Sequence, residues 1–272
     1  MTNFATGMLR VQESAAILGE WTASGHTASS EWLFWVVRIA AWSGVALLLS
    51  LVARAIVRRH RYRAMDILSQ EDCDAVSRKI HDAEKTTTGE IVAVVLERSD
   101  RHPGAEWLAA MSTLLLGSAV FAGYLPWDTP MYLLPCQIAL GGLGFLLARV
   151  LPDFKRLFIS EQRASEMTGE QALQEFFVQG LYKTDAATGV LIFVSLLEHR
   201  VVILADEGIN GKVDSTYWEE TDASILDGIR AGSLHKGIED GIARCGEVLA
   251  EHFPWQEGDK DELPNHLIVR QE

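Results

Sequence analysis

An acidic pair, Asp206 and Glu207, directly follows the apolar run RVVILA and is itself followed by Gly208. The run and its neighbour GVLIFVSL, separated only by the short LEH turn, predict two strands of a hairpin. Carboxylates are hard oxygen ligands, so the acidic end of this hairpin is the best candidate site in the chain. Asp-Glu-Gly is also ordinary turn chemistry, and both interpretations stay open at this point.

Other reactive residues lack the spacing that catalysis needs. The Asp-x-Asp sequence Asp259 to Asp261 lies in a polar tail with no strand before it, unlike the site of haloacid-type phosphatases. Cys73 has Arg78 five residues on, but it falls on a predicted helix with acidic neighbours that would raise its thiol pKa. The sequence contains no Gly-x-x-x-x-Gly-Lys-Ser/Thr, Gly-x-Ser-x-Gly or His-Glu-x-x-His motif.

Cysteine spacing and net charge argue against a zinc site, a disulfide framework and nucleic-acid binding. The three cysteines form no Cys-x-x-Cys motif, so neither a zinc site nor a disulfide framework is predicted: Cys73, Cys136 and Cys245. The 272-residue chain has a formal net charge of −13. From Asp153 to Glu272 there are 11 Lys and Arg against 23 Asp and Glu, a balance of −12. This part would repel nucleic acid and anionic lipid, so we expect no nucleic-acid partner.

Three apolar segments predict a multi-pass membrane protein. The first, Leu33 to Val57, is of membrane length, with Arg38 and Arg54 placed to snorkel from its ends. The next two, Trp107 to Leu125 and Met131 to Ala148, carry no charge and are joined by the short PWDTP turn, so they predict a transmembrane hairpin over 107–148.

Arginine placement predicts the orientation of these segments. The sequence RRHRYR follows the first span, whereas residues 1–32 hold one Arg and three Glu. The positive-inside bias therefore places segment 1–32 outside the cytoplasm and both polar parts inside, in an inner (cytoplasmic) membrane. Small residues in the hairpin indicate close helix packing or self-association: Ala119, Gly123, Gly141 and Gly144.

The two polar parts, 64–104 and 153–256, can build one domain. The first predicts a helix capped by Ser69 and Asp72, then the buried strand EIVAVVLE. One helix and one strand cannot bury a core alone, so the second part must complete it. Residues 257–272 predict an acidic polar tail.

The second part predicts a helix, the strand hairpin and two more helices. Thr168 and Gln171 predict the cap of the first helix, whose apolar face would be Leu173, Phe176, Phe177 and Leu181. After the antiparallel hairpin, 213–230 and 234–253 predict two helices. The first strand should lie parallel to the second across a helical crossover. The predicted fold is an α/β protein: a three-layer α/β/α sandwich with a small sheet, plus three transmembrane helices.

The chain resembles the TPM domain family, the thylakoid acid phosphatase-like domain of bacterial membrane-associated proteins and plastids. The resemblance rests on TTGEIVAVV, on GVLIFVSLLEHRVVILADEGI and on the Gly-punctuated GIEDGIARCGEVLAEHFP. It covers residues 66–100 and 160–254. The chain is similar to a branch of predicted membrane proteins in which a transmembrane hairpin interrupts the domain, and its acidic tail GDKDELPN also resembles that branch.

The resemblance implies two lines of function. Some family members are described as acid phosphatases, and the fold is associated with divalent-cation sites near acidic loops. Carried onto this chain, it implies Ca²⁺ or Mg²⁺ ligands among five acidic residues: Asp185, Asp206, Glu207, Asp214 and Asp222. Here TDAATG keeps only Asp185 of the cluster that many members have before the second strand, a departure that weakens the implied ion site.

Two hypotheses of different classes follow. The first is an integral membrane protein whose cytoplasmic TPM-like domain is an interaction, assembly or maintenance module for other membrane proteins. The alternative is a divalent-metal-dependent phosphatase centred on the acidic loop after RVVILA, a weak activity implied by the resemblance alone. Substrate, catalytic residues and oligomeric state are not determined by the sequence.

Overall fold

The computed structural model describes residues 62–122, 133–184, 186–259 and 262–271, together with Ser43, Ser50, Ala53 and Arg54. The predicted segment 1–32, nearly all of the predicted span 33–57, and Asp185 therefore lie outside the described residues. The elements in chain order are α2 (Ala64–Ile67), α3 (Gln70–Glu84), β1 (Glu90–Leu96), α4 (Pro103–Ala122), α5 (Leu133–Val150), α6 (Pro152–Arg156), α7 (Glu161–Val178), the 3-10 helix η3 (Leu181–Lys183), β2 (Gly189–Ser195), β3 (Arg200–Ala205), α8 (Glu207–Asn210), α9 (Ser215–Arg230), α10 (Leu234–His252) and β4 (Ile268–Arg270).

A four-stranded sheet forms the centre of the domain, in the order β3-β2-β1-β4. As predicted, β1 pairs with β2 in parallel, and β2 pairs with β3 as an antiparallel hairpin. Every residue of β1 and β2 is buried, because each strand has neighbours on both sides and helices on both faces. Strand β4 lies parallel to β1 within the segment expected to be a polar tail, and the sequence did not predict it.

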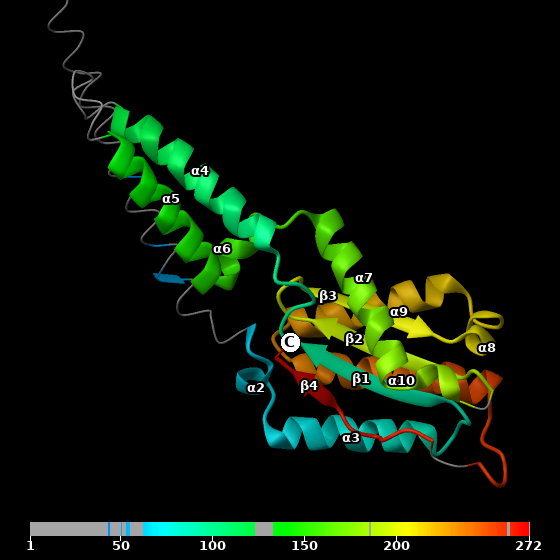
Figure 1. Ribbon diagram of the computed structural model, residues 1–272. Coiled ribbons are helices and arrows are strands. Elements are labelled where there is room, and N and C mark those ends of the chain that lie inside the picture. The colour runs from blue at the N-terminus through cyan, green and yellow to red at the C-terminus, as the bar shows by residue number, and fades with distance from the viewer. Residues whose placement is uncertain are drawn as a thin grey trace, which may run out of the picture. The chain divides into compact units, whose positions relative to one another are not determined.

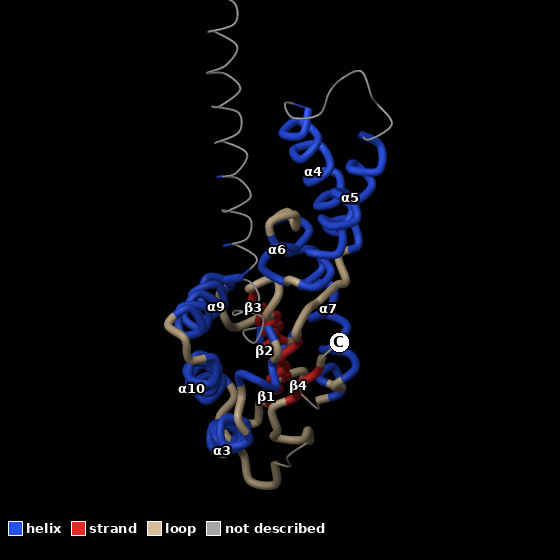
Figure 2. The backbone as a smooth tube through the Cα atoms, turned by 90° about the vertical axis from the view of Figure 1, so that its left-hand side faces the viewer, coloured by secondary structure: helices blue, strands red, loops and turns tan. Residues whose placement is uncertain are grey.

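Helices cover both faces of this sheet (Figures 1 and 2). On one face, α3 packs on β1, α10 on β1 and β2, and α9 on β3; on the other, α7 packs on β2 and β3. Alternate strand residues point to opposite faces of the sheet, and each face has its own hydrophobic core. Ile91 and Ile192 pack in the larger core, and Val92 and Phe193 pack in the smaller one. The predicted α/β sandwich is confirmed at this level.

Helix α3 begins as predicted. The Ser69 side chain accepts a hydrogen bond from the Asp72 backbone N–H, and the Asp72 carboxylate accepts one from the Ser69 N–H. These two bonds form a capping box, which satisfies backbone donors that a helix start leaves open.

The predicted start of α7 is wrong. Its N-cap is Ser160, whose hydroxyl accepts from the Arg163 N–H, and Thr168 lies in mid-helix, donating back to the Ala164 carbonyl. The predicted apolar face is also only half correct, because Phe176 and Leu181 are buried whereas Leu173 and Phe177 are half exposed.

Helices α4 and α5 separate β1 from α7 in the chain, and residues Ala110–Gly144 belong to a compact unit distinct from the domain. Small residues let the helices approach within this unit. A Cβ on Gly117 would come within 2.7 Å of Leu140, and one on Gly141 within 3.4 Å of Leu114.

The prediction of three membrane helices needs correction. Among the described residues, one helix, α5, is long and apolar enough to cross a membrane. Helix α4 begins at Pro103, before the predicted span, and includes the charged Glu106 in its first turn. The first predicted span lies outside the described residues.

Candidate functional site

Two of the acidic residues considered as cation ligands are helix caps. Asp206 is the N-cap of α8, and its carboxylate accepts a 2.7 Å hydrogen bond from the Glu207 N–H. Asp214 is the N-cap of α9 and accepts from the Thr216 N–H at 2.8 Å. A carboxylate at a helix N-terminus satisfies an open donor and faces the positive end of the helix dipole. Glu207 is exposed in the first turn of α8.

Gly208 explains the rest of the Asp-Glu-Gly sequence. A Cβ at this position would lie 2.5 Å from the Ala186 carbonyl oxygen and 2.7 Å from that of Ala187. Helix α8 therefore rests directly on the backbone that leads into β2. The glycine is needed for this close approach between two chain segments.

Asp222 has a different environment, because it lies on α9, the helix that packs on β3. Burial raises the pKa of its carboxyl to about 7, against the opposing backbone hydrogen bond at Ile203 and with a smaller contribution from Glu219. Its Oδ1 atom is buried and has no hydrogen-bond partner among the described residues. A half-protonated carboxyl in this place is a poor ligand for a cation unless the proton leaves.

The described residues contain no group of three or more His, Cys, Asp and Glu side chains that could hold a metal ion. Asp185 lies outside them, so the predicted Ca²⁺ or Mg²⁺ site stays a prediction. Burial raises the pKa of the Cys245 thiol to about 12, and burial with Asp72 and Asp74 raises that of Cys73, so these two thiols are not activated.

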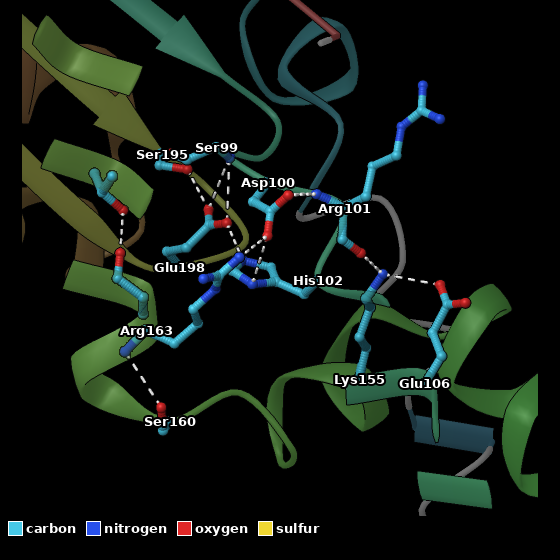
Figure 3. Close-up of polar contacts among 12 residues, drawn as sticks. Ser99, Asp100, Arg101, His102, Glu106, Lys155, Ser160, Arg163, Ser195 and Glu198 are labelled. Carbon is cyan, nitrogen blue, oxygen red and sulfur yellow. Dashed lines mark hydrogen bonds and ion pairs between the residues drawn. The ribbon is translucent and has the colours of Figure 1, made fainter. Parts of the chain in front are cut away.

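A polar cluster with a buried centre, which the sequence did not predict, lies where the apolar hairpin leaves the domain (Figure 3). We call it the junction cluster. Its members come from the loop after β1, from the end of β2 and from the β2–β3 turn, and they are Ser99, Asp100, His102, Ser195 and Glu198. His102 directly precedes the first residue of α4, so the cluster holds the start of the hairpin.

Glu198 is the centre of the junction cluster. Its Oε1 lies 2.6 Å from His102 Nε2, the Ser99 N–H donates to both of its carboxylate oxygens at 3.2 Å, and the Ser195 hydroxyl donates to Oε2. Burial would raise the pKa of Glu198, but these hydrogen bonds outweigh it and hold the pKa below its usual value.

The other side of His102 faces a second carboxylate. Its Nδ1 lies 3.5 Å from Asp100 Oδ2, and the same oxygen lies 3.2 Å from Arg163 Nη2 at the start of α7. Burial opposes ionisation of Asp100, yet the hydrogen bonds from Arg163 and from the Arg101 N–H leave its pKa lowered. The cluster thus joins the loop after β1 to both the β2–β3 turn and α7.

The order of groups in the junction cluster does not match a nucleophilic triad. In a nucleophilic triad the histidine lies between serine and carboxylate, whereas here the carboxylate of Glu198 lies between Ser195 and His102. Ser195, His102 and Glu198 are at most 4% exposed, so no substrate reaches them. Buried, mutually bonded groups of this kind hold chain segments in a single arrangement.

A second set of contacts lies where the chain returns from the hairpin to the domain, directly after α5. Lys155 on α6 is buried; its ammonium donates to the Arg101 carbonyl and lies 3.0 Å from Glu106 Oε1 at the start of α4. Asp153, also on α6, accepts a hydrogen bond from the Tyr62 hydroxyl. The Tyr62 ring stacks on the His199 ring, with 5.6 Å between the ring centroids. The chain entering and the chain leaving the hairpin are therefore bonded to each other and to the β2–β3 turn.

The junction cluster could not be read from sequence spacing, because His102 and Glu198 are 96 residues apart. The one local signal is the charged loop RSDRHPG between a buried strand and an apolar helix. A histidine before Pro103, with a left-handed φ of 45°, marks a fixed turn.

Fold and cluster together define an α/β sandwich domain that an apolar helical hairpin interrupts. Residues 157–248 match the family model described as TPM domain, which confirms the resemblance seen in the sequence over this part of the chain. A similar solved structure is the NMR structure of BA42 protein from the psychrophilic bacterium Bizionia argentinensis, with 23% identity and a TM-score of 0.49, covering 76% of this chain and 99% of that one. Among curated proteins, none matches.

Proposed function

We propose that this chain is a membrane-embedded protein that holds a TPM domain at the cytoplasmic surface as an interaction module for other membrane proteins. The observation that carries the proposal is the apolar hairpin inserted within the domain and bonded to it at both ends by buried polar contacts. An anchor of this kind would hold the domain more firmly than a terminal tail on a flexible linker.

The surface of the hairpin supports membrane insertion. Large apolar side chains stand exposed along both helices: Trp107, Leu108, Met111, Leu115, Leu116, Val120, Leu134, Ile138, Leu143, Leu146 and Val150. Only 11% of the apolar window of α5 is buried. An exposed apolar surface of this extent is unfavourable in water and favourable in a bilayer.

The charges that flank the segments support a cytoplasmic domain. Four arginines lie in RRHRYR after the first predicted span, and Arg149 and Arg156 follow the core of α5. The positive-inside bias retains such residues in the cytoplasm. Protease added outside intact cells should then spare the domain and cut it only after the membrane is opened; cleavage in intact cells would reverse the orientation.

Membrane embedding is tested by fractionation of the full-length chain. We expect the protein to stay in the membrane pellet after alkaline carbonate and to dissolve in detergent. The Leu134→Asp and Ile138→Asp double variant should shift protein to the soluble fraction or lower its level, because each charge costs about 3 kcal/mol in a bilayer. The matched control is Gln174→Asp on the exposed side of α7. Release of the unaltered chain by carbonate would overturn the proposal.

A further inference from the structure

The outer side of α7 carries an exposed apolar surface within the TPM domain. Four side chains form it, at the C-terminal end of α7 and the start of η3, and we call them the α7 patch: Leu173, 52% exposed; Phe177, 53%; Val178, 57%; and Tyr182, 48%. The inward side of the same helix packs on the sheet through Ala172 and Phe176. The four side chains of the α7 patch are therefore not part of the hydrophobic core.

The two aromatic members of the α7 patch contact each other. The Phe177 and Tyr182 rings lie 5.4 Å apart, and Phe177 also meets Phe176 edge-on at 6.0 Å. Leu173 and Phe177 are one helical turn apart and so lie side by side. A contiguous exposed surface with aromatic side chains is typical of interaction sites, unlike apolar residues scattered singly.

Acidic residues continue the line of the α7 patch toward the N-terminus of α7. Glu166 and Glu170 are exposed, and the spacing from Glu166 through Glu170 and Leu173 to Phe177 is four, three and four residues. This spacing places all four on one helix face. Lys183, beside the Tyr182 ring at 5.4 Å, is the basic residue at the opposite end of the patch.

We propose that the α7 patch binds a basic amphipathic helix of a partner protein. Apolar side chains of that helix would cover Leu173 and Phe177, and its Lys or Arg residues would lie opposite Glu166 and Glu170. Docking of a helix along a helix face uses side chains at this spacing on both partners. The charge balance of −12 over residues 153–272 adds long-range attraction for a basic partner.

Charge argues against two other occupants. An anionic bilayer surface would repel Glu166 and Glu170, and so would the same face of a second copy of this chain in parallel register. Both occupants remain outcomes of the test below. The inference deepens the proposed function, since it rests on the TPM domain being an interaction module and gives the chemistry of its partner.

The experiment measures binding of a labelled helical peptide of Leu and Lys, arranged so that Leu forms one face, to the full-length chain in uncharged detergent. A peptide with Glu in place of Lys is the matched probe. We expect saturable binding of the Lys peptide alone. Phe177→Ser should weaken it by about tenfold or more. Leu157→Ser, which alters an exposed apolar residue outside the α7 patch, should leave it unchanged.

A charge exchange separates recognition from loss of structure. The Glu166→Lys and Glu170→Lys double variant should lose the Lys peptide and gain the Glu peptide, which a misfolded variant would not do. Equal binding of both peptides, or equal loss in Phe177→Ser and Leu157→Ser, would overturn the proposal. So would Phe177-dependent binding to vesicles containing anionic lipid, or Phe177-dependent dimerisation. Fractionation tests embedding separately, so failure of the α7 patch and failure of the anchor are distinguishable.

Discussion

Asp222 is a carboxyl with a structural role at a place where the family resemblance implied a cation ligand. Strand β3 is the edge of the sheet, and its outward backbone groups must be satisfied by something other than a strand. The hydrogen bond between Asp222 on α9 and the Ile203 backbone provides one such contact. Burial raises the Asp222 pKa to about 7 because that position is poorly hydrated.

The raised pKa makes a prediction about stability and pH. The folded chain holds a proton on Asp222 that the unfolded chain has lost above about pH 4, so the free energy of unfolding should fall as pH rises from about 4 to about 7. The slope is on the order of 1 kcal/mol per pH unit. Denaturant unfolding of the detergent-solubilised chain at several pH values would measure it. In Asp222→Asn the slope should flatten, and an unchanged slope would assign the pH dependence to other groups.

The pair between His102 and Glu198 makes a second prediction at this scale. Glu198→Ala leaves His102 buried without its partner and should lower the free energy of unfolding by about 3–5 kcal/mol. Glu166→Ala, on the exposed side of α7, should change it by less than about 0.5 kcal/mol. The lowered Glu198 pKa means that the stabilisation is present above about pH 4.5 and is lost as pH falls below it.

A double-mutant cycle gives the control for this pair. Replacing both His102 and Glu198 by leucine removes the two polar partners together, so it should destabilise less than the two single leucine changes added. Additive effects would mean that the two side chains act independently.

At the scale of elements, α9 and α10 pack against each other at a point where each helix has a glycine. A Cβ on Gly228 would lie 2.7 Å from the Gly237 Cα, and one on Gly237 would lie 2.7 Å from the Ile225 carbonyl oxygen. Gly237→Ala must push the helices apart and should cost about 1–3 kcal/mol. Gly169→Ala in α7 meets nothing within 4 Å and should stabilise by about 0.5–1 kcal/mol. Thermal unfolding measures both, and equal effects would contradict the packing argument.

The elements that the sequence predicted correctly are those with a strong local pattern. Continuous apolar runs identified β1, β2 and β3, and Ser69 with Asp72 identified the start of α3. The start of α7 was missed because its Ser160 cap has Arg163 three residues on, whereas Thr168 has the Gln that the capping pattern favours. Strand β4 has only three residues in a polar context, and its pairing with β1 decides its conformation.

The candidate site was less predictable than the fold. Asp206 and Asp214 have residue types that suit cations, but the same types are favoured at helix N-caps, and the pattern does not separate these roles. The junction cluster was missed because its contacts join the loop after β1 to a turn far along the chain. Only the parallel pairing of β1 and β2 brings those two places together.

At the scale of the whole molecule, the domain is one folding unit made from two pieces of chain. The first piece supplies β1, which lies between β2 and β4 of the second piece, so neither piece has a complete sheet alone. The compact unit that holds the sheet joins residues Arg54–Ala109 with Phe145–Glu272. Folding therefore requires that the end of α5 return close to the start of α4. The hydrogen bonds of Lys155 to Arg101 and Glu106 join these two ends.

This closure predicts that the hairpin anchors the domain without being needed for its fold. In a chain that begins at residue 62 and replaces 107–145 with a short Gly-Ser linker, the first turn of α4 and all of α6 remain, and so do the Lys155 and Glu198 contacts. Loop-closure entropy changes only slowly with loop length, so the shortened chain should fold. We expect it to be soluble without detergent, with cooperative thermal unfolding. The same chain carrying Glu198→Ala should unfold at a lower temperature. A shortened chain that aggregates or unfolds without cooperativity would show instead that the hairpin is part of the folding core.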